Sequence, residues 1–232
     1  MNGIAGAIGP WAQCLLSYRA SMRAPGVLLY WVRKFCAAPR VWVPVMGAIW
    51  LGAAASGLWI LWRYDNTPGE AAAAPDRWPA PATLVRATDR PTLVMLAHPH
   101  CTCTRASLEE LAEVIARART APKTYVLFMS PRRFGDGWEQ TDLWRQASAI
   151  PGATVVRDDD GREARQFGAA TSGQTLLYDE RGVLVFSGGL TGARAHAGDN
   201  LGRQSLVALL NHDPAPRNGT SVFGCPLFHL GS

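Results

Sequence analysis

Residues 92–119 read TLVMLAHPHCTCTRASLEELAEVIARAR, and this stretch predicts the fold. Its first six residues form a continuous apolar run, which is typical of a strand buried on both faces of a sheet. From 105 to 119 apolar residues recur at three- and four-residue spacing, which predicts an amphipathic helix. Cys101 and Cys103 lie between the two patterns. Both thiols are therefore expected where the strand ends and the helix begins.

The sequence on the C-terminal side of this stretch continues to alternate between strand and helix patterns. Such an order, closed by a hairpin and a final helix, predicts an α/β fold whose mixed sheet is flanked by helices on both faces. The predicted strands are 92–97, 124–129, 153–157, 175–179 and 183–186. The predicted helices are 105–119, 138–149, 162–167 and 201–210.

Charge is distributed unevenly along the 232 residues. Five of the 23 Lys and Arg residues fall in residues 1–40, where there is no Asp or Glu. The other basic residues are balanced by the 18 acidic ones, so the part after residue 62 is neutral. The net charge of +5 thus belongs to a basic tail and not to a binding surface. This pattern argues against a nucleic-acid partner.

Residues 41–62 read VWVPVMGAIWLGAAASGLWILW and contain no charged residue. A helix of this length reaches about 33 Å, and the hydrocarbon core of a bilayer is about 30 Å thick. The sequence therefore predicts a transmembrane helix, with the basic tail in the cytoplasm by the positive-inside rule. Two alternatives stay open: a cleaved signal peptide, with a small-residue site at 53–56, and a buried core helix.

The rest of the chain divides at a change of composition. Residues 63–82 are rich in Pro and Ala without apolar periodicity, which predicts an extended spacer. Residues 83–232 are expected to form one domain. The sequence as a whole predicts a single-pass protein of the inner (cytoplasmic) membrane, with this domain on the periplasmic or extracytoplasmic side.

The position of the cysteine pair suggests redox chemistry. A thiol at a helix N-terminus is favoured as the thiolate by the helix dipole, and a thiolate attacks disulfides. We expect Cys101 to be the attacking nucleophile, Cys103 to be the resolving thiol, and His100 to tune the thiolate. Cys14 and Cys36 precede the predicted span and are expected to stay reduced, because the cytoplasm is reducing.

The segments HPHCTCTRASL, FGAATSGQTLLYD and GGLTGARAHAGDN add a resemblance. With them, 83–232 resembles the thioredoxin-like domain of membrane-anchored periplasmic thiol-disulfide oxidoreductases, and in detail the RedB-like group. The resemblance implies an enzyme with a thioredoxin-like fold that acts on protein thiols and disulfides without a cofactor.

In that family a cis-proline and its neighbours line the substrate groove, and this position aligns with Ser172 and Gly173. The chain departs from the family motif Trp-Cys-x-x-Cys in two further ways. His100 stands in place of the Trp, and only Thr102 separates the two cysteines. These departures put conventional reductase activity in doubt and leave metal binding open.

A second function is therefore kept beside thiol-disulfide exchange. Thiolate and imidazole are ligands of copper and zinc, so the same cysteines can form a metal-binding or metal-delivery module. The candidate ligands of this alternative are Cys101, Cys103, His98, His100 and Cys225. A third hypothesis is that the domain is a redox-inactive interaction module.

Two features outside the motif have a structural and a functional interpretation. Cys225, four residues before His229, is a third resolving thiol, a metal ligand or a buried apolar residue, and the last is favoured because free Cys is commonly buried. His196 and Asp199 either form a hydrogen-bonded pair or belong to a solvated loop, with Asp199 or Asn200 capping the last helix.

Overall fold

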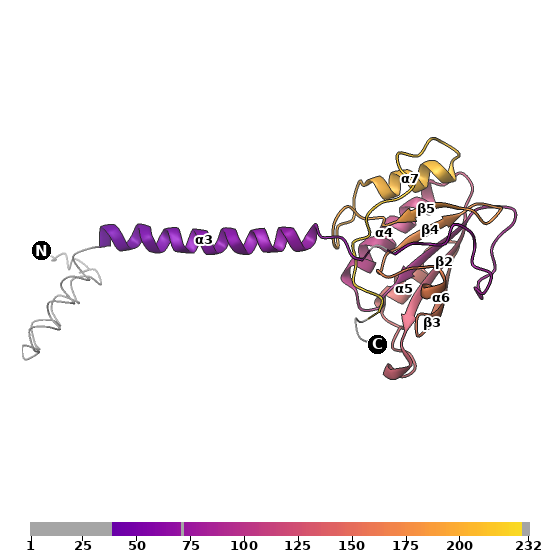
Figure 1. The fold of residues 1–232 in the computed structure, drawn as a ribbon, viewed down its shortest axis with the longest axis horizontal. Coiled ribbons are helices and arrows are strands. Elements are labelled where there is room, and N and C mark those ends of the chain that lie inside the picture. Colours follow the sequence, from indigo (N-terminus) through magenta and orange to yellow (C-terminus); the bar gives the residue numbers. More distant parts are fainter. Residues whose placement is uncertain (1–38, 71, 229–232) are drawn as a thin grey trace, which may run out of the picture. The chain divides into compact units, whose positions relative to one another are not determined.

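The computed structural model of the chain describes residues 39–70 and 72–228, and the side chains from Trp42 onward. The predicted tail, apart from its last two residues, and His229 lie outside the described residues. The chain divides into two compact units between Ile60 and Leu61. Figure 1 shows one long helix and a sheet covered by shorter helices.

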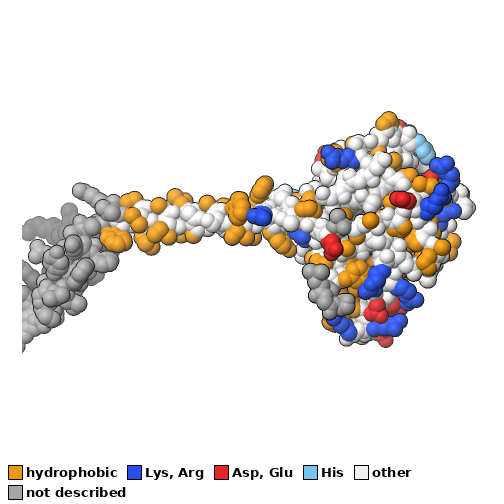
Figure 2. Space-filling view, viewed as in Figure 1, with side chains coloured by type: hydrophobic (Ala, Val, Ile, Leu, Met, Phe, Trp, Pro, Cys, Tyr) orange, Lys and Arg blue, Asp and Glu red, His pale blue; other side chains and the backbone are white. Residues whose placement is uncertain are grey.

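The long helix is α3, Pro39–Asp65, and it contains the predicted span 41–62. Its stretch Trp42–Asp65 has a mean hydropathy of 1.6, so it is long and apolar enough to cross a membrane. Figure 2 shows hydrophobic side chains along this helix. They are exposed over most of its length.

The second unit contains one five-stranded sheet with the order β3-β2-β1-β4-β5. The three strands β1, β2 and β3 are parallel, and β4 and β5 are antiparallel to their neighbours. The strands are β1 (Thr92–Ala97), β2 (Lys123–Ser130), β3 (Ala153–Asp159), β4 (Thr175–Tyr178) and β5 (Leu184–Gly188). The remaining helices are α4 (Thr102–Arg117), the short 3-10 helix η2 (Arg132–Phe134), α5 (Asp142–Ser148), α6 (Arg162–Gln166) and α7 (Leu201–Leu210).

Each face of the sheet is covered, which explains why β1 is apolar at every position after Thr92. Leu93 and Met95 point into one hydrophobic cluster, together with apolar residues of α4, α5 and α7. Val94 and Leu96 point into the other, which includes residues of α6. Side chains alternate along a strand, so a strand between two cores needs an unbroken apolar run. The predicted α/β fold, a mixed sheet with helices on both faces, is confirmed.

Most predicted element bounds differ by a few residues from the observed ones, and two of these differences bear on the cysteine pair. Helix α4 begins three residues earlier than predicted, so its first turn includes Cys103. Helix α5 begins only at Asp142, and the residues before it, with Trp138, form turns. Both differences lie next to the cysteine pair.

Part of the stretch 63–82, which its composition predicts to be an extended spacer, packs against the sheet. Residues 76–78 pair with the start of β5: Trp78 N donates to Gly182 O (2.8 Å) and Leu184 N to Asp76 O (2.8 Å). The Trp78 ring packs 5.1 Å from the ring of Phe167 and 5.3 Å from that of Tyr178. A Pro-rich segment is suited to a sheet edge, where a missing N–H costs little. This segment is held by one aromatic side chain and by backbone pairing at the sheet edge. Neither contact produces a periodic pattern in the sequence, so the packing could not be predicted from it.

This packing leads to a prediction about Trp78. We expect Trp78→Ala to lower the free energy of unfolding of the domain by about 2–4 kcal/mol, because it removes a large, half-buried side chain. The matched control is Arg77→Ala, whose side chain is exposed, with an expected change below about 0.5 kcal/mol. Urea unfolding of the full chain in detergent measures both. Equal losses in the two variants contradict a packing role for Trp78.

Candidate functional site

The site is built at the N-terminus of α4, directly after β1. Cys101 is the N-cap residue of α4, with extended backbone angles (φ −107°, ψ 121°) and a side chain that does not cap the helix. The turn that leads to it is closed by Cys101 N, which donates to His98 O (3.2 Å), and by Thr104 Oγ1, which donates to the same oxygen (3.0 Å). The sulfur of Cys101 therefore lies at the positive end of the helix dipole.

A segment from the far end of the chain brings a third thiol to the pair. The Sγ atoms of Cys101 and Cys225 lie 2.9 Å apart, although 124 residues separate them in the sequence. The segment pairs with the loop before β4: Ser172 N donates to Cys225 O (2.9 Å), and Leu227 N donates to Ala170 O (2.7 Å). A side chain at Gly224 would place its Cβ 1.9 Å from Ser172 O, so only glycine permits this approach.

The three thiols differ in exposure and in proton affinity. Cys101 is 1% exposed and Cys103 4%, whereas Cys225 is half-buried. Hydrogen bonds from the thiols of Cys103 and then Cys225 hold the pKa of Cys101 well below its ordinary value. The same contacts, with burial, raise the pKa values of Cys103 and Cys225. The arrangement therefore concentrates one negative charge on Cys101 and leaves its two neighbours protonated.

The polar loop 191–200 approaches the thiols from another side. The backbone N–H of Ala195 forms a hydrogen bond with the Cys103 sulfur, which by itself lowers the Cys103 pKa. The Arg194 guanidinium donates to Gly224 O through Nη1 (2.6 Å) and so fixes the segment that contains Cys225. Its positive charge also acts on Cys103 and Cys225, against the larger effects that raise their pKa values.

A buried ion pair holds the end of this loop against α4. Arg203 Nη1 lies 3.0 Å from Glu110 Oε2, with both side chains almost fully buried. Glu110 also accepts hydrogen bonds from Gly198 N and from Asn200 Nδ2 (3.3 Å). Asn200 is the N-cap of α7, because its side-chain oxygen accepts from Arg203 N (2.9 Å). The predicted cap of the last helix is thus Asn200.

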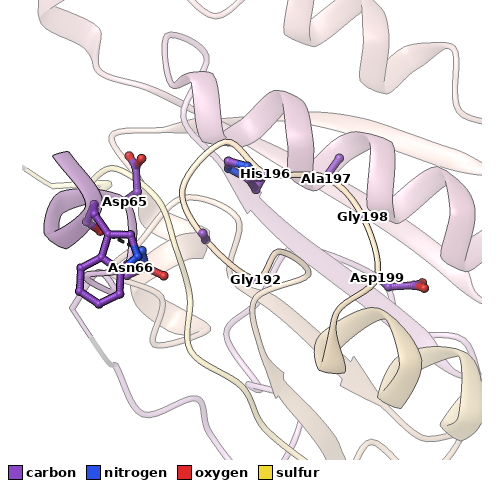
Figure 3. Close-up of a pocket in the computed structure, with 9 residues that line it drawn as sticks. Asp65, Asn66, Gly192, His196, Ala197, Gly198 and Asp199 are labelled. Carbon is purple, nitrogen blue, oxygen red and sulfur yellow. Dashed lines mark hydrogen bonds between the residues drawn. The ribbon is translucent and has the colours of Figure 1, made fainter. Parts of the chain in front are cut away.

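His196 and Asp199 do not form the pair that the sequence left open. Figure 3 shows the two side chains on separate parts of the loop, pointing away from one another. Asp199 instead forms an ion pair with Arg203. The loop therefore contributes Arg194 and Ala195 to the thiol cluster, two residues that the sequence did not single out.

The two histidines of the motif are engaged with a tryptophan of the loop before α5. The His100 ring lies 4.6 Å from that of Trp138, and its Nε2 is 3.2 Å from Trp138 O. The His98 ring lies 5.4 Å from Trp138, and His98 Nδ1 accepts from His100 N (3.2 Å). The groups that lower the pKa of Cys101 are the neighbouring thiols and backbone N–H groups.

The contacts of the histidines bear on the metal alternative. Within 39–70 and 72–228, no group of three or more His, Cys, Asp and Glu side chains has the arrangement of a metal site. The structure brings Cys225 to Cys101 and Cys103, but it places His98 and His100 against Trp138. The five candidate ligands therefore do not come together as one set.

Ser172 and Gly173 precede β4, and the Ser172 N–H donates to Cys225 O. Ser172 is fully buried, and its Oγ accepts from His98 N (2.9 Å) and lies 2.8 Å from Thr104 Oγ1. Gly173 has a φ of +89°, and its N–H donates to Leu96 O (2.7 Å). The described residues contain no cis peptide bond. The chain's own segment 225–227 is paired along this loop.

A hollow of about 320 Å³ opens next to this cluster. Its lining includes His98, Trp138 and Phe134, and from the C-terminal segment Leu227 and Phe228. The rings of Phe134 and Trp138 are stacked at 4.9 Å. The sequence predicts a helix at Trp138, but this residue lies in a turn, which has no periodicity by which the surface could have been predicted.

Comparisons with known proteins show the fold and no more. No family model and no curated protein matches the chain. An uncharacterized conserved protein from Geobacillus kaustophilus superposes with a TM-score of 0.54 at 18% identity, covering 71% of this chain and 99% of that one. A hypothetical protein from Sinorhizobium meliloti 1021 gives 0.52 at 16% identity, covering 69% and 97%. A secreted Mycobacterium tuberculosis disulfide oxidoreductase, at 16% identity, reaches only 0.32 over 41% of this chain and 66% of its own, too low to bear on function.

Proposed function

We propose that the protein exchanges dithiols for disulfides through Cys101. The observation that supports this most directly is the position of the Cys101 sulfur, at a helix N-terminus and in contact with two other thiols. A thiolate stabilised in this way is both the best nucleophile and the best leaving group of the cluster. One of the two contacting thiols, Cys103 in the motif or Cys225, resolves the mixed disulfide.

The remaining roles follow from the contacts around this sulfur. His100 is a positioning residue that connects the Cys101 turn to Trp138. Ser172 and Gly173 shape the loop that faces the cysteines, and Ser172 ties it to the His98 turn. The substrate is a thiol or disulfide of another polypeptide, for which the aromatic hollow beside His98 offers an apolar contact. The resemblance to the RedB-like group is part of this proposal.

The proposal includes a location. Residues 41–62 cross the inner membrane, with residues 1–40 in the cytoplasm, and the domain of 83–232 acts outside it. The exposed apolar side chains of α3 and the excess of basic residues before it support this orientation. Disulfides form and persist in oxidising compartments outside the cytoplasm, so a protein that exchanges them is expected to act there.

The experiment is thiol trapping of the full chain in detergent, in a series of glutathione redox buffers. Cys14 and Cys36 are replaced by Ser so that only the domain thiols report. We expect one reversible two-electron transition, closer to about −120 mV than to about −270 mV, because a stabilised thiolate favours the reduced form. If the domain thiols show no redox transition in this series of buffers, the proposal is overturned. Thiols that react only after addition of a chelator favour the metal module instead.

A further inference from the structure

We propose that Cys225 is the disulfide partner of Cys101, and that the Cys101–Cys225 disulfide is the one that the protein passes on. This inference rests on the proposed function and assigns its second sulfur. It gives the C-terminal segment 224–227 a role in the reaction, and it separates Cys103 from the exchange.

The contact geometry supports the pairing. The two Sγ atoms are 2.9 Å apart, and a disulfide bond is about 2.0 Å long, so the sulfurs need to approach by only about 1 Å. Cys225 lies on a separate segment, held by backbone hydrogen bonds to Ala170 and Ser172 and by Arg194. Closing the bond requires no change in α4.

The C-x-C pair is less suited to a disulfide. Cys103 lies within the first turn of α4, only two residues after the N-cap. The two thiols are in hydrogen-bond contact, but positions two apart in a helix lie on different faces, so a covalent bond between them has to deform this turn. The Cys103 sulfur is also held by the N–H of Ala195. Cys103 then serves as the hydrogen-bond donor to the Cys101 thiolate.

Exposure decides which sulfur a partner can reach. Among the three thiols of the described residues, only Cys225 is not buried. In the oxidised protein a partner thiolate attacks Cys225 Sγ. A bond forms between these two sulfurs, the Cys101–Cys225 bond breaks, and its electron pair leaves on Cys101 as the thiolate. The leaving sulfur is the more acidic one, which is the faster direction of exchange.

The second half of the reaction completes the transfer. A second thiolate of the partner attacks the partner sulfur bound to Cys225, forms the partner's disulfide and releases Cys225, which takes up a proton. The partner dithiol loses two electrons and two protons. The protein gains the two electrons, one proton goes to Cys225, and the other goes to solvent because Cys101 remains a thiolate. Glutathione disulfide returns the protein to the oxidised state in vitro.

Trypsin allows the disulfide to be identified in the full chain. The pair Cys101 and Cys103 falls in the peptide 87–105, because the Arg90–Pro91 bond resists cleavage, and Cys225 falls in 218–232. The chain with Cys14→Ser and Cys36→Ser is oxidised with glutathione disulfide, its free thiols are blocked, and the non-reduced digest is analysed by mass spectrometry. We expect 87–105 linked to 218–232, with fragmentation at Thr102 placing the link on Cys101.

The alternative results are distinct. An internal disulfide within 87–105, or a link from Cys103 to Cys225, overturns this inference and leaves the proposed function standing. If neither peptide contains a disulfide, both this inference and the proposed function are overturned. Cys103→Ser is expected to keep the linked peptides, and Cys225→Ser to lose them.

A kinetic measurement tests the same assignment without peptide mapping. The oxidised full chain is mixed with reduced glutathione, and the release of thiols is followed. We expect Cys225→Ser to slow this reaction by about tenfold or more, because any remaining disulfide is buried with Cys101 and Cys103. An unchanged rate in Cys225→Ser overturns the inference.

Discussion

Cys101→Ser is expected to abolish the two-electron transition of the domain and with it the exchange of disulfides. Cys101 is the thiol that contacts both of the others, so its removal leaves no pair in contact around it. The measurement is thiol trapping in glutathione buffers. The matched control is Thr102→Ser, which alters the next residue, exposed at the start of α4, and keeps all three sulfurs.

The pH dependence of the same variant pair tests the charge of Cys101. Because the Cys101 pKa is lowered, the reduced protein is expected to retain one thiolate at pH 5, where an ordinary cysteine is protonated. Ultraviolet thiolate absorbance of the reduced chain measures it. Cys101→Ser is expected to show no thiolate until the pH reaches the ordinary range of a thiol or above, since burial still raises the pKa values of Cys103 and Cys225 when Cys101 is absent. If thiolate absorbance depends on pH in the same way in the unsubstituted chain and in Cys101→Ser, Cys101 is not the stabilised thiolate.

Arg203→Met is expected to lower the free energy of unfolding by about 3–5 kcal/mol, because it leaves the buried carboxylate of Glu110 without its cation. Urea unfolding of the reduced full chain measures the loss. The double variant Glu110→Gln with Arg203→Met is expected to be more stable than Arg203→Met alone, since it removes the uncompensated charge.

The control for this loss of stability is an Arg–Glu ion pair that is exposed to solvent. Arg117 and Glu113 are one turn apart on α4, with both side chains about half exposed. Arg117→Met is therefore expected to change stability by less than about 0.5 kcal/mol. If Arg203→Met proves as mild as Arg117→Met, the ion pair does not hold loop 191–200 against α4.

The parts of the fold that could be predicted are those with a strong local pattern. The apolar run of β1 and the three- and four-residue spacing in α4 depend only on the period of a strand and of a helix. The same holds for α7, whose predicted and observed bounds agree, and for the long apolar helix α3. The pairing of Trp78 with residue Gly182, more than 100 positions away, could not be predicted, because composition does not record contacts with distant segments.

The candidate site shows the same division. The sequence by itself determined that Cys101 and Cys103 meet a helix N-terminus, because strand and helix periods change at that point. The sequence could not show that a thiol outside the C-x-C motif contacts Cys101. Cys225 reaches it through backbone pairing across more than 100 residues and through a glycine that lets two backbones touch. Such contacts depend on the packing of the whole domain and leave no periodic trace in the sequence, so only the tertiary structure decided them.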